Sequence, residues 1–154
     1  MPRKRRIQYP GACYHVLARG NEKKDIFRDE QDRYRFLRFL DETRKDYGLI
    51  IHAYVLMPNH YHMALEIQEC NLSKAMQFLN TKYSVYFNYK NKRTGHLFQG
   101  RYKAILAERD NYLLELTRYI HLNPIRAGLV KKLKDYRWSS YREMTGGDEW
   151  RRIA

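Results

Sequence analysis

The stretch that most constrains the fold is residues 53–67, with the sequence AYVLMPNHYHMALEI. It is typical of two β-strands separated by a tight Pro-Asn break. Because side chains on a strand alternate between its two faces, Tyr61 and the apolar residues after it share one face, while His60 and His62 share the other. We expect Tyr61 to point into the core, with its hydroxyl finding a partner there. Imidazole is the commonest protein metal ligand, so the two histidines indicate a candidate metal site.

Hydrophobic periodicity and turn residues predict the remaining elements. Strands are expected over residues 14–19, 49–56, 60–67 and 101–107, and helices over 29–48, 72–89 and 110–123. The strands 49–56 and 60–67 are too close for a crossover connection, so they should pair as an antiparallel hairpin. Pro124 is expected to end or kink the last helix at Asn123. The order of elements predicts an α+β fold, a ferredoxin-like antiparallel sheet with helices packed on one face.

The chain of 154 residues is long enough to bury the core of one domain. We expect a single domain over residues 1–154, with a basic N-terminal arm over about 1–9. A C-terminal segment, over about 131–154, is expected to dock on the domain through Trp138 and Tyr141.

Cysteine content and hydropathy bear on the compartment. Cys13 and Cys70 lack the spacing of a metal or redox motif, so we expect them to be plain small side chains. There is no disulfide framework, no apolar run that would span a membrane and no secretory signal. These features favour a cytoplasmic protein without a membrane partner.

The charge balance favours a polyanionic partner. Lys and Arg number 30 against 17 Asp and Glu, so the formal net charge is +13. Nucleic acid is the first expectation and an anionic membrane the second. Tyr-rich aromatic residues interleaved with basic ones suit stacking on unpaired bases. The alternative is a solvated basic surface without a partner.

Several residues are candidates for DNA contact. They are His96, Gln99, Arg101, Lys103, Lys92, Arg93, Arg5 and Arg6. Gly95 and Gly100 would let a strand approach the backbone closely. The basic residues of this set could instead belong to solvated faces, and the N-terminal arm could be only a solubilising tail.

The helix predicted over 110–123 offers the second half of a site. Tyr119 and Asn123 are four residues apart, so they project from nearly the same side of the helix. Beside His60 and His62 they would give two imidazoles, an amide oxygen and a phenol. Such a set suits a divalent ion, Mg²⁺ or Mn²⁺. Tyr119 could then attack a phosphate as an in-line nucleophile. By spacing alone, however, a histidine pair of this kind is more often structural, and a lone tyrosine is more often core or surface.

For three further residues we expect no direct part in the chemistry. His15 alternates onto one face with Leu17 and is expected to be structural. His121 points away from Tyr119 on a helix and is expected at the surface. Glu66 lies on the histidine face and could orient the metal ligands by hydrogen bonding to them.

Four blocks of the sequence carry a family resemblance. They are YVLMPNHYH at 54–62, GHLFQGRYK at 95–103, RYIHLNPIRAGLV at 118–130 and WSSY at 138–141. In this order they resemble the single-tyrosine HUH transposases, especially the branch associated with repetitive extragenic palindromes. The resemblance implies that His60 and His62 bind a divalent metal, with Asn123 as the third ligand and Tyr119 as the nucleophile.

The same resemblance implies a reaction. A transposase of this family cuts single-stranded DNA next to a hairpin, forms a 5′-phosphotyrosine, leaves a free 3′-OH and transfers the strand without a nucleotide cofactor. Relatives include homodimers and monomers, so the oligomeric state stays open. Two rival functions also remain: a nucleic-acid-binding protein that does not cut, and a metal-dependent nuclease that uses water.

Overall fold

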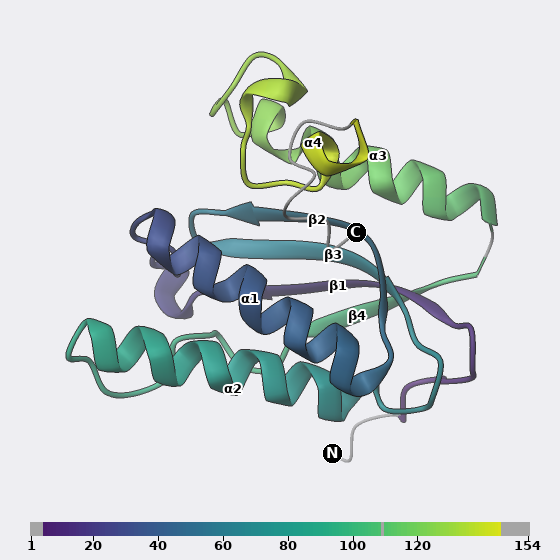
Figure 1. The fold of residues 1–154 in the computed structure, drawn as a ribbon, viewed down its shortest axis with the longest axis horizontal. Coiled ribbons are helices and arrows are strands. Elements are labelled where there is room, and N and C mark those ends of the chain that lie inside the picture. Colours follow the sequence, from purple (N-terminus) through teal and green to yellow (C-terminus); the bar gives the residue numbers. More distant parts are fainter. Residues whose placement is uncertain (1–4, 109, 146–154) are drawn as a thin grey trace.

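The computed structural model describes residues 5–108 and 110–145. Its strands are β1 (Cys13–Arg19), β2 (Ile50–Met57), β3 (His60–Glu66) and β4 (Lys103–Ala107). Its helices are α1 (Glu30–Tyr47), α2 (Leu72–Lys90), α3 (Asp110–Arg126) and α4 (Tyr141–Met144), with 3-10 turns at η1 (Asn21–Lys23) and η2 (Leu133–Asp135). The strands form one antiparallel sheet in the order β2-β3-β1-β4 (Figure 1). The predicted α+β class and antiparallel sheet are confirmed.

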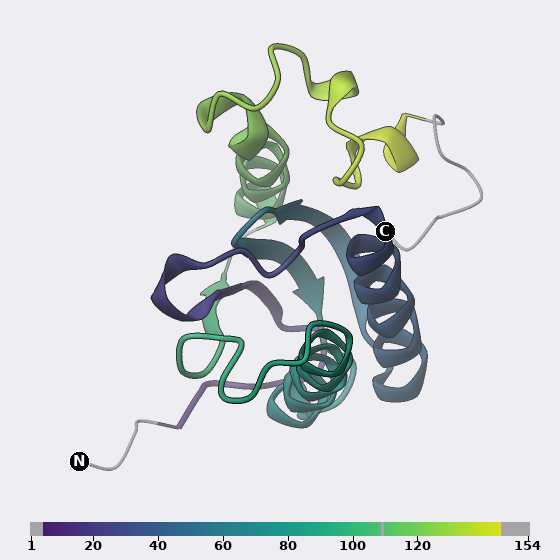
Figure 2. The same ribbon diagram turned by 90° about the vertical axis from the view of Figure 1, so that its left-hand side faces the viewer.

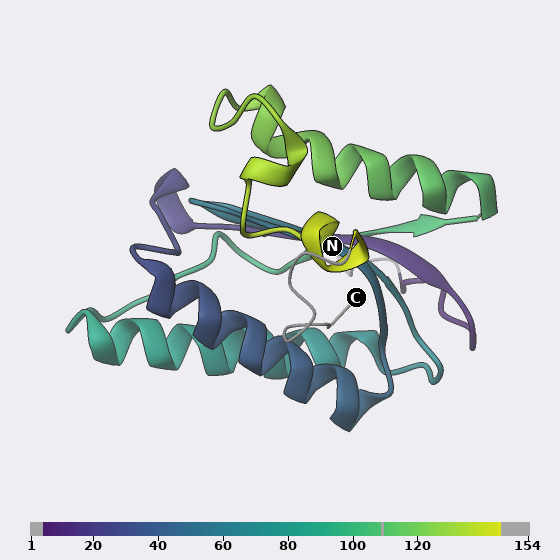
Figure 3. The ribbon, with the colours of Figure 1, turned by 45° about the horizontal axis from the view of Figure 1, so that its top comes forward.

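The helices lie on both sides of this sheet. Figures 1 and 3 show α1 and α2 against one face and α3 across the other. The prediction that helices share one face therefore holds for α1 and α2, whereas α3 lies opposite them. The reason is that Leu116 and Ile120 of α3 are buried, and β2 and β3 offer the apolar side chains of Val55 and Ala64 on that second face. Within the described ranges, no helix combines the length and apolar character needed to cross a bilayer.

The ends of the helices follow from local chemistry. Asp29 caps α1 by accepting a hydrogen bond from the backbone N–H of Asp32 at 2.9 Å, and Gly48 ends it in the left-handed conformation. Pro124 does not end α3 at Asn123, which is one of the two effects expected of it. The helix continues through Pro124 to Arg126. Pro124 removes only one N–H donor, and the next turn is still held by a bond from the N–H of Ala127 to the carbonyl of Asn123 at 2.9 Å.

The main core lies between the sheet and the pair α1 and α2. Tyr61 is fully buried there, with its ring centroid 4.9 Å from that of Phe36. Its hydroxyl donates to Oδ1 of Asn80 at 2.6 Å. The residue between the two histidines is thus a core residue with a satisfied hydroxyl, as its alternation predicts.

The described part of the predicted C-terminal segment, residues 131–145, covers the outer edge of β2; residues 1–4 and 146–154 lie outside the described residues. Leu56 donates its N–H to the carbonyl of Trp138 at 2.8 Å, and Ser140 donates to that of Tyr54 at 3.0 Å. The Trp138 ring also packs edge-on against Tyr34 of α1, with centroids 5.0 Å apart. An otherwise open strand edge is thereby paired.

A buried ion pair ties α1 to α2. Asp32 is fully buried and accepts from Nζ of Lys90 at 2.8 Å, from the hydroxyl of Tyr86 at 3.0 Å and from the N–H of Arg28 at 2.9 Å. The carboxylate is therefore compensated on each of its oxygens. A buried charge with these partners is stable, but each partner is costly to remove.

We expect Lys90→Met to lower the free energy of unfolding by about 1–3 kcal/mol, because the Asp32 carboxylate would lose its cation inside the protein. The matched control is Lys82→Met on the same helix, whose ion pair with Glu42 of α1 is solvent-exposed. The control should cost less than about 1 kcal/mol. Denaturant unfolding of both variants measures the difference, and equal losses would contradict a special role for the buried pair.

Candidate active site

The two histidines of β3 lie on the sheet face that α3 covers. The ring centroids of His60 and His62 are 5.0 Å apart. The ring of Tyr119, from α3, lies edge-on to His62 with centroids 6.1 Å apart. Tyr119 is 44% exposed, whereas His62 is buried. Residues 57 positions apart in the sequence, His62 and Tyr119, thus meet at one site with an open, reachable phenol.

Each histidine is held through its Nδ1 atom. Nδ1 of His60 lies 2.6 Å from Oδ1 of Asn59, and this oxygen can only accept, so the proton of His60 is on Nδ1 and the lone pair on Nε2. Nδ1 of His62 lies 2.9 Å from Nε2 of His15 on the neighbouring strand β1. The tautomer of His62 that donates to His15 also leaves its Nε2 as an acceptor. Metal-binding histidines are characteristically oriented in this way through the second ring nitrogen.

Burial keeps these imidazoles neutral. It lowers the pKa of His62 to about 3, with further lowering by the neighbouring His60 and His15. The pKa of His60 is lowered by burial and by the positive charge of Arg19, and that of His15 by burial. Neutral imidazole is the form that binds metals. The donor set of His60 and His62 therefore fits a divalent cation.

Asn123 and Arg126 extend the site along α3. The side-chain amide of Asn123 donates from Nδ2 to the carbonyl of Tyr119 at 3.2 Å, which leaves Oδ1 as its acceptor atom. The guanidinium of Arg126 lies 4.1 Å from the ring centroid of Tyr119 and donates to the same carbonyl. The placement of Asn123 as a third metal ligand stays a prediction.

Of the candidate DNA-contact residues, Lys103 is placed on the histidine face by strand pairing. It pairs with Leu17 of β1, which in turn pairs with His62, and residues directly opposite each other in a sheet share a face. Its side chain is exposed. Gln99 is also exposed, in the loop before β4, where its backbone N–H donates to the carbonyl of Arg19 at 2.8 Å.

Three other candidates surround a cavity on the far side of the sheet. Arg6, His96 and Arg101 line a space of about 870 Å³ between α2 and residues 95–102. Figure 2 shows this loop running beside α2. The guanidinium of Arg6 stacks 4.2 Å from the ring centroid of Tyr102.

The remaining candidates lie apart from both groups. Lys92 and Arg93 form the turn after α2, where Arg93 donates to Oδ1 of Asn88 at 2.6 Å, and Arg5 is exposed in the N-terminal segment. The predicted contact residues are thus distributed over several surfaces, and their contacts with DNA stay predictions.

Four residues at the site carry contacts that sequence reasoning missed. They are His15, Arg19, Asn59 and Arg126. The alternation of His15 and Arg19 on one strand was a usable signal, as was the spacing of seven between Tyr119 and Arg126. The relation of His15 and Arg19 to the histidines of β3 depends on strand pairing, and that of Arg126 depends on where α3 packs. The sequence displays neither.

Two expectations are wrong. His121 is buried, with Nε2 2.8 Å from Oγ of Ser140, because the C-terminal segment covers the back of α3; burial lowers its pKa to about 4. Glu66 does not support the metal ligands. Its Oε1 is bonded instead to Nε2 of His52 at 3.2 Å and to Sγ of Cys13 at 3.5 Å.

Most of the chain matches a known protein family. Residues 8–123 match the family described as "Transposase IS200 like". The chain belongs to the IS200-like transposase family. No curated protein sequence matches this transposase. As a member of the family it is an enzyme of DNA transposition, and DNA is its substrate.

Solved structures share the fold. One is a REP-associated tyrosine transposase bound to a REP hairpin, 19% identical, with a TM-score of 0.77 over 95% of this chain and 86% of that one. A Deinococcus radiodurans R1 protein described as a transposase is 16% identical, with a TM-score of 0.53 over 78% of this chain and 95% of that one. The tRNA(His) guanylyltransferase of Saccharomyces cerevisiae is 8% identical, with a TM-score of 0.53 over 79% and 62%. At these identities the likeness is one of fold.

Ser140 of the transposase joins α3 to the sheet, and its removal provides a test. Oγ of Ser140 contacts Nε2 of His121 and accepts from the N–H of Tyr54 at 2.9 Å. We expect Ser140→Ala to lower the free energy of unfolding by about 1–3 kcal/mol, because both buried partners lose a bond. Thr145→Ala, at an exposed position of the same segment, should change it by less than about 0.5 kcal/mol. If chemical denaturation gives the two variants the same free energy of unfolding, the bonds of Ser140 do not hold α3 in place.

Proposed function

We propose that this transposase cuts and rejoins single-stranded DNA at hairpin-flanked sites through a covalent 5′-phosphotyrosine on Tyr119. The observation that carries the proposal is the Tyr119 phenol, 44% exposed, beside the ring of His62. A half-exposed phenol next to neutral imidazoles can meet a phosphate that approaches from solvent.

His60 and His62 would hold a divalent metal, Mg²⁺ or Mn²⁺, with Asn123 as the third ligand. When bound, the metal would supply a Lewis acid that polarises a non-bridging phosphate oxygen. His15 and Asn59 hold the two imidazoles through Nδ1, which would leave Nε2 of each histidine available to bind the ion.

Tyr119 supplies the nucleophile. Its Oη forms a bond to phosphorus while the bond to the 3′-oxygen breaks; the phenolic proton is lost, and the departing oxygen gains a proton to become a 3′-OH. Arg126 places a positive charge beside the phenol, where an approaching phosphate is stabilised. The 3′-OH of another strand can then attack the phosphotyrosine and release Tyr119. Each step exchanges one phosphodiester for another, so no nucleotide cofactor is needed.

Hairpin-flanked single-stranded DNA is the proposed substrate. The solved relative with the same fold over 95% of this chain is bound to a REP hairpin. The net charge of +13 favours a polyanion, and Lys103 and Arg19 lie on the histidine face. Arg6, His96 and Arg101 would serve as a second contact region at the cavity beside α2. Gln99, Lys92, Arg93 and Arg5 would add contacts elsewhere on the surface.

Tyr119→Phe tests the nucleophile. We expect it to bind hairpin DNA within about twofold of the parent protein but to form no covalent adduct, because only the attacking oxygen is removed. The matched control is Tyr112→Phe, which removes another exposed phenol from the same helix and should leave adduct formation unchanged. The measurement is a denaturing gel of protein incubated with labelled single-stranded DNA and Mn²⁺.

Each contrary outcome points to a rival function. Persistent adduct in Tyr119→Phe would refute this assignment of the nucleophile. Cleavage by the parent protein without any adduct would identify a nuclease that uses water, and tight binding without cleavage would identify a binding protein.

His15→Leu tests the support of the metal ligands. We expect the affinity for Mn²⁺ to fall about 10–100-fold, because His62 loses the partner that orients it. His96→Leu is the control, since it removes an imidazole that lies at the cavity beside α2, away from the histidine face. A titration followed by electron paramagnetic resonance of free Mn²⁺ measures both. Equal affinities in the two variants would contradict a positioning role for His15.

A further inference from the structure

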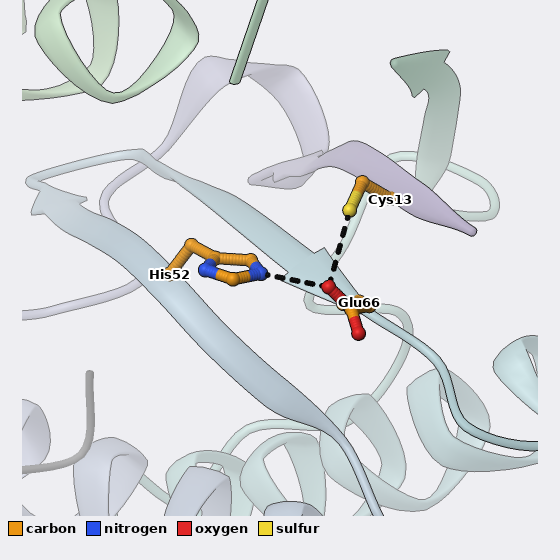
Figure 4. Close-up of side chains that lie close together, drawn as sticks. All are labelled: Cys13, His52 and Glu66. Atoms are coloured by element: carbon orange, nitrogen blue, oxygen red, sulfur yellow. Dashed lines mark hydrogen bonds and ion pairs between the residues drawn. The ribbon is translucent and has the colours of Figure 1, made fainter. Parts of the chain in front are cut away.

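A second group of metal-binding side chains lies toward the other end of the histidine face. Cys13 of β1, His52 of β2 and Glu66 of β3 converge there, with their ligand atoms all within 4.8 Å of one another (Figure 4). Oε1 of Glu66 lies 3.2 Å from Nε2 of His52 and 3.5 Å from Sγ of Cys13. All three side chains are partly buried, and none has a part in the proposed cleavage.

The strands bring these residues together by two separate features. Cys13 lies directly opposite Glu66 in the pairing of β1 with β3, so the two share a face. His52 lies at an irregularity in the pairing of β2 with β3, between Ile51 and Ala53. An extra residue in a strand re-aims its side chain, and here the imidazole reaches across to Glu66. Figure 4 shows the imidazole and the thiol directed at the same carboxylate oxygen.

We propose that Cys13, His52 and Glu66 form a second metal site, which binds Zn²⁺ with water in the fourth position. Zinc takes sulfur at about 2.3 Å and nitrogen or carboxylate oxygen at about 2.0–2.2 Å in tetrahedral geometry. From those lengths, the edges of such a tetrahedron are about 3.3 Å between nitrogen and oxygen and about 3.5 Å between sulfur and oxygen. The separations in the protein, 3.2 Å and 3.5 Å, agree with both edges before any ion is bound.

Charge and ligand softness specify the ion. On binding, the thiol of Cys13 releases its proton to solvent, and the thiolate and the Glu66 carboxylate together balance the two charges of Zn²⁺. Thiolate selects zinc over Mg²⁺ and Mn²⁺, whereas imidazole with amide oxygen suits the latter ions. The two sites on this face would therefore take different metals. Because the three ligands come from three strands, the bound ion would join the ends of those strands.

Co²⁺ substitution separates this site from the proposed active site. We expect the full-length protein titrated with Co²⁺ to show a near-ultraviolet sulfur-to-cobalt charge-transfer band, which requires a thiolate ligand. Cys13→Ser should abolish the band, and Cys70→Ser should retain it, because Cys70 is exposed and lies outside the group. The double variant His60→Ala, His62→Ala should also retain it.

Thiol protection in the unaltered protein provides a measurement that needs no variant. We expect Zn²⁺ to slow alkylation of Cys13 roughly tenfold or more while Cys70 reacts at its metal-free rate, since a metal-bound thiolate is withdrawn from reaction. Peptide mass mapping with and without Zn²⁺ measures both rates. The proposal is overturned if Co²⁺ gives no charge-transfer band, if the band survives in Cys13→Ser, or if Zn²⁺ leaves the alkylation of Cys13 unchanged.

Discussion

The alternation of side chains along β3 is the constraint on which the site depends. Tyr61 is fixed in the core by Phe36 and by its bond to Asn80. With Tyr61 held there, His60 and His62 must face the other side of the sheet. A slip of one residue would place both imidazoles in the core and the phenol outside, so the packing energy of the core also enforces the position of the histidines.

The second constraint is the helix that lies over those histidines. α3 buries Leu116 and Ile120 against the sheet, and His121 bonds to Ser140 in the segment that covers the edge of β2. Tyr119 is held on the opposite side of α3 from this anchor, facing His62. The active centre is thus divided between two parts of the chain whose relative position is set by apolar packing and one buried hydrogen bond.

Helix ends and strand alternation, which local chemistry determines, could be predicted from the sequence. The helix predicted over 29–48 is capped by Asp29 and ended by Gly48, and the alternation around Tyr61 is found as predicted. The bond between His15 and His62 could not be predicted, because it requires β1 to lie next to β3. The burial of His121 depends on a segment that follows it by almost twenty residues, and the cluster of Cys13, His52 and Glu66 depends on an irregularity in β2. Spacing rules detect ligands within one element, whereas these sets are assembled across elements.

The pairing of β1 with β3 connects the two ends of the histidine face. The register that sets Cys13 opposite Glu66 also sets Leu17 opposite His62, which brings His15 within reach of His62 along the same strand. A single register therefore determines both the support of the proposed catalytic metal and the ligand set of the proposed zinc site. A slip of two residues would keep the core face apolar yet separate Cys13 from Glu66 and move His15 relative to His62. An ion bound at the Cys13 end would favour the native register over that slip, and so hold the imidazoles of the other end in place.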